Sequence, residues 1–242
     1  MRNIKLSIEY DGTNFFGWQT QNNLRTVQSE IENIGEKFLK HKIKLIGAGR
    51  TDTGVHAKGQ IANFKTEVNL SCKKILSAFN GLLPNDIAIY DVEDVDIFYN
   101  SRFDAKLREY SYTISKIPTA ILKNFSIEIF YPLDIKKMNK CAKNLIGKFD
   151  FSSFCKSIDE VKNTICEVKF AEWREENQLL IFSIKANRFI HGMVRAIVGT
   201  LIDVGRKKIS IEEFNKIFFS KNRIFASQSA PSKGLTLEKV IY

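Results

Sequence analysis

The chain has 242 residues, 44% of them hydrophobic, so it is long enough for one large domain or two small ones with a sizeable core. Its 37 lysines and arginines outnumber 27 acidic residues, and the net charge of +10 favours contact with a polyanion, with nucleic acid as the first candidate. The basic residues are scattered along the chain rather than gathered on one amphipathic helix, which argues against a membrane-surface protein.

The N-terminal residues interleave charged and apolar side chains, and no apolar run approaches the roughly 18 residues of a membrane-spanning helix. We therefore expect a cytoplasmic protein. No two cysteines form a CxxC pair and the histidines lie far from them in the sequence, so we expect neither a metal site nor a disulfide framework. Reduced and mostly buried side chains are the simpler interpretation of Cys72, Cys141, Cys155 and Cys166.

The first half of the chain alternates between the patterns of strands and helices. Apolar residues alternate with polar ones over residues 4–10, which predicts a strand that ends at Asp11-Gly12. Apolar residues at helical spacing over 27–38 predict a helix that Thr26 caps. The other predicted elements are strands at 43–46, 60–64 and 87–92 and a helix that Ser71 opens.

The second half repeats this order without a matching sequence repeat. The patterns predict a strand at 107–114, a helix at 134–147, strands near 164–172 and 179–186, an apolar helix at 190–204 and a closing strand at 235–241. Ser210 and Glu213 form a capping box, which predicts an extra short helix before the last strand.

Each half therefore has the order strand, helix, strand, strand, helix, strand, which is the ferredoxin-like (RRM-like) arrangement. The predicted class is α+β, with the two halves joined into a central, mainly antiparallel sheet with a cleft between them. We place the N-terminal half at residues 1–103 and the C-terminal half at 104–242.

The stretch from Gly47 to His56 is the least ordinary part of the sequence, because its three glycines permit close approach of a ligand to the backbone. If Arg50 to Asp52 is extended, the two side chains point the same way, and the guanidinium would keep the carboxylate ionised. Such an aspartate can act as a nucleophile or a base. The alternative is a turn aspartate that bonds its own backbone, with Arg50 as an ion-pair partner.

The sequence GAGRTDTGVHA around Asp52 resembles the active-site motif of the tRNA pseudouridine synthase A (TruA) family. The segments Tyr10–Thr13 and Phe16–Gln19 resemble the opening of that family, and the resemblance extends over both halves. It continues in Arg102–Ala105 with Arg108, Tyr110 and Tyr112, in Met193–Arg195 with Val198–Thr200, and in Ala230-Pro231 with Gly234-Leu235.

The resemblance implies a fold of the pseudouridine synthase type and roles for individual residues. Asp52 corresponds to the catalytic aspartate, and Tyr110 to the tyrosine that contacts the target base. Arg50 is similar to the motif arginine that takes the space of a flipped base, and Arg195 resembles the basic residue near the carboxylate. Either arginine could instead contact a phosphate. Leu235 is implied in substrate binding. A sheet-core tyrosine is the alternative for Tyr110.

Other basic residues are candidates for contacts with the RNA backbone, although a lone surface cation is most often only solvated. Arg108, Tyr110 and Tyr112 should share one face of their strand, where a basic and aromatic stripe would suit RNA. The candidates for contacts with the RNA backbone are Arg102, Lys106, Arg108 and Arg206.

We assign no catalytic role to His56 and His191, because a structural histidine is the simpler interpretation of each.

The reaction that the resemblance implies is isomerisation of uridine to pseudouridine, at positions 38, 39 and 40 in the anticodon stem-loop of tRNA, by a homodimer. This reaction needs no cofactor and no metal, and tRNA is the expected partner.

Two other classes of protein fit parts of the pattern. A non-catalytic protein with two RRM units would share the order of elements, but residues 58–64 lack the paired stacking aromatics of an RNP1 stretch. A glycoside hydrolase would need two placed carboxylates, and the motif offers one.

Overall fold

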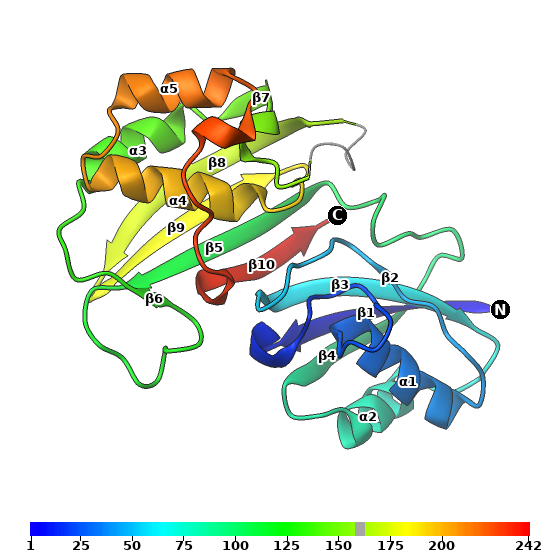
Figure 1. The fold of residues 1–242 in the computed structure, drawn as a ribbon. Helices are drawn as coiled ribbons and strands as arrows, with labels where there is room; N and C mark the ends of the chain where they lie inside the picture. Colours follow the sequence, from blue (N-terminus) through cyan, green and yellow to red (C-terminus); the bar gives the residue numbers. More distant parts are fainter. Residues whose placement is uncertain (158–162) are drawn as a thin grey trace. The chain divides into compact units, whose positions relative to one another are not determined.

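The computed structural model describes residues 1–157 and 163–242, which form two compact units (Figure 1). Unit 1 comprises Met1–Lys106 and Leu237–Tyr242, and unit 2 comprises Leu107–Thr236. The predicted boundary was after residue 103, with the whole C-terminus in the second half. The units divide instead after Lys106, and the C-terminal residues return to unit 1.

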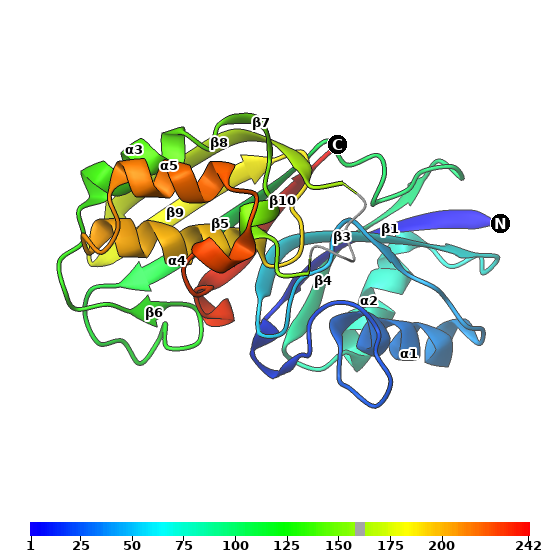
Figure 2. The ribbon, with the colours of Figure 1, turned by 45° about the horizontal axis from the view of Figure 1, so that its top comes forward.

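Unit 1 has the predicted order of elements, with strands paired in the order β4-β1-β3 and β2 attached to β3. Strand β1 lies in the middle of this group and pairs antiparallel with both neighbours. Helices α1 and α2 lie on one face of these strands (Figures 1 and 2). The elements are β1 (Arg2–Tyr10), α1 (Val27–Leu39), β2 (Ile46–Gly47), β3 (His56–Thr66), α2 (Cys72–Leu82) and β4 (Ile87–Val95), with a 3₁₀ helix at Gly12–Asn14.

Local signals explain where the helices of unit 1 begin. Thr26 caps α1 with a capping box that Ser29 completes, and Ser71 caps α2. The strand expected at 43–46 shrinks to Ile46–Gly47, because side chains of α1 bind the backbone of Leu45 instead of a neighbouring strand. The Leu45 N–H donates to Glu32 Oε1 at 2.8 Å, and the Leu45 carbonyl accepts from Gln28 Nε2 at 3.3 Å.

Unit 2 pairs its strands in the order β5-β9-β8-β7, all antiparallel, with the short β6 parallel to β5. Helices α3, α4 and α5 lie on the same side of the sheet, with α3 against β8 and α5 against α3 and α4 (Figures 1 and 2). The elements are β5 (Leu107–Ser115), β6 (Ile127–Glu128), α3 (Ile135–Lys143), β7 (Gly147–Asp150), β8 (Ile165–Glu176), β9 (Leu179–Ala186), α4 (Met193–Gly205) and α5 (Ile211–Phe219), with 3₁₀ helices at Ser152–Phe154, Arg223–Phe225 and Ser232–Gly234.

Helix α3 ends earlier than the sequence predicted, at Lys143 rather than 147. Gly147 has φ of +135°, a backbone conformation that other residues rarely adopt, and it opens β7 opposite Val168 of β8. The predicted capping box of α5 is confirmed, since Ser210 and Glu213 each bond the backbone of the other.

The last strand, β10 (Leu235–Ile241), begins in unit 2 and continues into unit 1, where it lies beside β3. Glu238 forms an ion pair of 3.1 Å with Lys58 of β3, and a Cβ added at Gly59 would come within 2.5 Å of the Glu238 carbonyl oxygen. Gly59 therefore allows this close approach. The mixed α+β class with mainly antiparallel strands is confirmed.

Candidate functional site

The loop that carries Arg50 and Asp52 joins β2 to β3 in unit 1, and β3 fixes its first part. The Ala48 N–H donates to the Ile61 carbonyl at 2.7 Å, and the buried Gln60 side chain donates to the Gly49 carbonyl at 2.9 Å. These two bonds tie residues 48 and 49 to β3 at the point where the loop leaves the sheet.

The segment that follows β1 holds the second part of this loop. The Trp18 N–H donates to the Thr51 carbonyl at 3.1 Å, and the Gly54 N–H donates to the Phe15 carbonyl at 3.2 Å. Arg25 lies over the Phe15 ring at 4.2 Å and binds both carboxylate oxygens of Asp86, at 2.7 and 2.9 Å. These contacts anchor the segment that follows β1.

Asp52 lies in the middle of the loop with a half-buried side chain, and its carbonyl accepts from the Val55 N–H at 3.1 Å across a turn. Gly54 in that turn has φ of +73°, which favours glycine. The ion pair expected between Arg50 and Asp52 is not formed: the Arg50 guanidinium is exposed and has no ion-pair partner among residues 1–157 and 163–242. Arg50 is thus a cation available to a ligand.

His56 is a buried structural neighbour of this loop. Its Nδ1 accepts the Gly12 N–H at 3.0 Å and lies 3.1 Å from an Asp11 carboxylate oxygen, while its side chain is 2% exposed. Gly12 is required here, because an added Cβ would lie 2.0 Å from the Val55 carbonyl oxygen. His191, the other histidine for which no catalytic role was predicted, is exposed in unit 2.

Both tyrosines of β5 are buried in unit 2, but their surroundings differ. Tyr110 lies opposite Ile184 of β9, and its ring meets that of Phe189 edge-on, with the centroids 5.0 Å apart. Tyr112 is fully buried, its hydroxyl donates to the Pro231 carbonyl at 2.8 Å, and burial raises the pKa of its phenol. The predicted basic and aromatic stripe is therefore wrong for Tyr112, which is a core residue.

Arg195 and Tyr112, which belong to separate motifs, meet at the segment Ala230-Pro231. The Arg195 Nε donates to the Ala230 carbonyl at 2.8 Å, and the Ala230 N–H donates to the Arg195 carbonyl at 2.9 Å. Gly234 packs against the Tyr112 ring, which an added Cβ would approach to 2.7 Å. This packing places Leu235, buried at the start of β10, in the same part of unit 2.

The four basic residues proposed for the RNA backbone are spread over both units. In unit 1, Arg102 lies 5.6 Å from the ring of Phe103, and Lys106 is exposed. In unit 2, Arg108 Nη1 donates to the Asn187 carbonyl at 2.8 Å. Arg206 is exposed, 5.3 Å from the ring of Tyr131 and 3.7 Å from the carboxylate of Asp203.

The structure thus divides the predicted site residues between the units. Asp52 and Arg50 share one loop of unit 1, whereas Tyr110, Arg195 and Leu235 belong to unit 2. Tyr10, whose hydroxyl contacts Thr51 in the Asp52 loop, was not among the predicted site residues. The signal for it was the YDGT segment, because the glycine marks a place where the chain passes close to another backbone.

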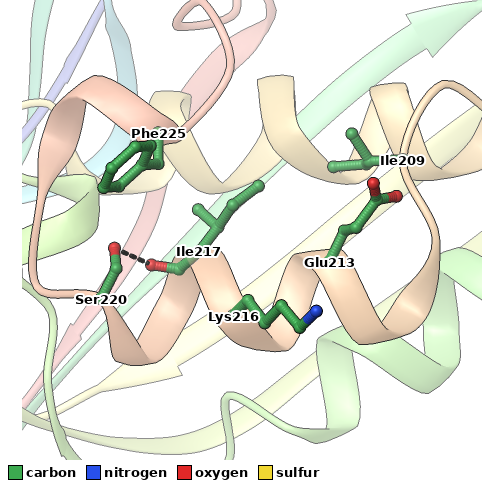
Figure 3. A pocket seen from close by; sticks show the side chains of 6 residues that line it. All are labelled: Ile209, Glu213, Lys216, Ile217, Ser220 and Phe225. Carbon is green, nitrogen blue, oxygen red and sulfur yellow. Dashed lines mark hydrogen bonds between the residues drawn. The ribbon is translucent and has the colours of Figure 1, made fainter.

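An apolar groove on the surface of unit 2 contains none of the predicted site residues. It runs along α5, where Ser220 Oγ donates to the Ile217 carbonyl at 2.7 Å (Figure 3). The groove is lined by Ile209, Glu213, Lys216, Ile217, Ser220 and Phe225.

No group of three potential metal ligands occurs within residues 1–157 and 163–242, and no helix in these ranges has the length and apolar character needed to cross a membrane.

Comparisons with known proteins support the family resemblance of the motif around Asp52. The sequence profile described as "tRNA pseudouridine synthase" matches residues 6–104 and 141–242. Proteins named tRNA pseudouridine synthase A from Caldicellulosiruptor saccharolyticus, Thermoanaerobacter pseudethanolicus and Clostridium acetobutylicum are 43%, 42% and 41% identical, each over 100% of both chains. The chain therefore belongs to the tRNA pseudouridine synthase family, whose enzymes isomerise uridine in tRNA.

Proposed function

We propose that the protein isomerises uridine to pseudouridine at positions 38, 39 and 40 of tRNA, in the anticodon stem-loop, with Asp52 as the catalytic carboxylate. The observation that carries this proposal is the Asp52 loop itself. A half-buried carboxylate sits in a loop whose backbone is bound on one side by β3 and on the other by the segment after β1. Such support holds a catalytic group in place before the substrate arrives.

The reaction rearranges bonds within one nucleotide. The bond from N1 to C1′ breaks, the uracil turns, a bond forms between C5 and C1′, the C5 proton leaves and N1 gains a proton. A carboxylate can serve as the nucleophile or as a base on the ribose. The target base must first leave its stack, and contacts with phosphates and pocket side chains supply the few kcal/mol that this costs.

The substrate-binding roles follow the family resemblance. Arg50, an exposed cation on the Asp52 loop, would take the space that the flipped base leaves. Tyr110 would contact the target base, and Arg195 and Leu235 would complete the binding site. The exposed cations Arg102, Lys106 and Arg206, with Arg108, would bind RNA phosphates and contribute to the attraction that the net charge of +10 provides.

Tritium release tests the activity and its target together. Unmodified tRNA labelled with tritium at uracil C5 should release tritium when the protein is added, because the C5 proton leaves in the reaction. A transcript with cytidine at positions 38, 39 and 40 should release none above background. Equal release from both transcripts would contradict the proposed target, and no release from either would contradict the activity.

We also propose that the working form is a homodimer that shares one tRNA. Sedimentation equilibrium at micromolar protein should then give twice the mass of the 27.8 kDa chain. A monomer that retains full activity under the same conditions would contradict this proposal.

A further inference from the structure

A buried pair of hydroxyl groups joins the end of β1 to the residue that precedes Asp52. The hydroxyl oxygens of Tyr10 and Thr51 are 2.7 Å apart, and the two residues are 2% and 6% exposed. Burial raises the pKa of the Tyr10 phenol well above its ordinary value, so this hydroxyl keeps its proton at neutral pH. The contact is a neutral hydrogen bond shielded from water, and either oxygen can donate.

The main chain of Thr51 is held from the same segment. The Trp18 N–H donates to its carbonyl, and the Trp18 ring lies 6.1 Å from that of Tyr10. Gly17 makes this approach possible, since it has φ of +87° and an added Cβ would come within 2.6 Å of the Thr51 carbonyl oxygen. Both the side chain and the carbonyl of Thr51 are therefore fixed by residues 10–18.

Fixing Thr51 constrains Asp52 directly, because a planar peptide bond links the two residues. The turn that follows Asp52 is fixed too, by the hydrogen bond from Gly54 to Phe15. The path of the backbone on both sides of the carboxylate thus depends on the segment after β1. A shift of about 1 Å in a catalytic group can slow a reaction on the order of 100-fold.

We infer that Tyr10 is a positioning residue for the reaction, which acts through the Thr51 hydroxyl to set the place of the Asp52 carboxylate. The inference rests on the proposed catalytic role of Asp52. As a positioning residue, Tyr10 does not itself contact a reacting atom. Its loss should slow the chemical step and leave binding of tRNA intact, because the hydroxyl pair is buried beneath the loop and away from solvent.

The test compares variants that remove or keep one hydroxyl. Tyr10→Phe and Thr51→Val should each slow single-turnover tritium release roughly 10- to 100-fold, with the Kd for tRNA unchanged. Thr51→Ser keeps the hydroxyl and should stay near the wild-type rate. The matched control is Tyr242→Phe, which also removes a phenol hydrogen bond of unit 1, the one of 2.8 Å to the Ser101 carbonyl, and should leave the rate unchanged.

The outcomes separate this inference from the proposed function. Wild-type rates for both Tyr10→Phe and Thr51→Val, with Asp52→Asn inactive, would overturn the inference alone. An active Asp52→Asn would overturn the proposed role of Asp52. A weaker Kd with an unchanged rate would also overturn the inference, because it would place Tyr10 in binding. Should Tyr10→Phe not fold, equal rates for Thr51→Val and Thr51→Ser would overturn it.

Discussion

Asp52→Asn is expected to lower single-turnover tritium release by roughly 10²- to 10⁴-fold, the range that one positioned acid or base contributes. The amide has nearly the shape of the carboxylate but neither its charge nor its basicity, so the loop should keep its backbone bonds. Binding of tRNA should remain, since it depends on cations and aromatic side chains elsewhere. Filter binding and tritium release on the same preparations measure the two properties.

Asp134→Asn is the matched control for this substitution. Asp134 caps α3 by accepting the Lys137 N–H, and asparagine caps helices about as well as aspartate, so the fold should not change. The variant has the same charge change in unit 2 and should retain wild-type turnover. Equal turnover of Asp52→Asn and the wild type would show that Asp52 is not the catalytic group.

Phe218→Ala is expected to lower the free energy of unfolding of unit 2 by roughly 3–5 kcal/mol, as is usual when a buried aromatic ring is removed from a core. Phe218, on α5, is 1% exposed. Its ring centroid lies 5.6, 5.2 and 5.8 Å from those of Phe149, Phe151 and Phe154. Alanine would leave a cavity beside three rings of the neighbouring segment 149–154.

Phe219→Ala is the comparison, because this neighbouring ring is 62% exposed and should cost about 1 kcal/mol or less. The chain has two tryptophans, Trp18 in unit 1 and Trp173 in unit 2, so a Trp18→Phe background lets fluorescence report on unit 2 alone. Urea titration of both variants in that background gives the two values. Equal losses of stability would mean that Phe218 is not central to this core.

The elements and their ends could be predicted because they depend on local sequence. Thr26, Ser71 and Ser210 cap the helices they were expected to cap, since a cap needs only a side-chain oxygen within reach of nearby N–H groups. The strand at 43–46 could not be predicted correctly. The backbone N–H and carbonyl of Leu45 bond to the side chains of Glu32 and Gln28. The local sequence does not show whether such groups will bond to a helix side chain or to a neighbouring strand.

For the site, the sequence by itself determined the glycine-bearing loop with Asp52 and the family to which the chain belongs, because both rest on contiguous residues. Only the tertiary structure decided that Tyr10 supports Thr51, that Tyr112 lies in the core and that Arg195 meets Ala230. It also decided that β10 passes from unit 2 into unit 1. Each of these is a contact between segments far apart in the chain, and such contacts depend on how the whole unit packs, which periodicity and spacing do not encode.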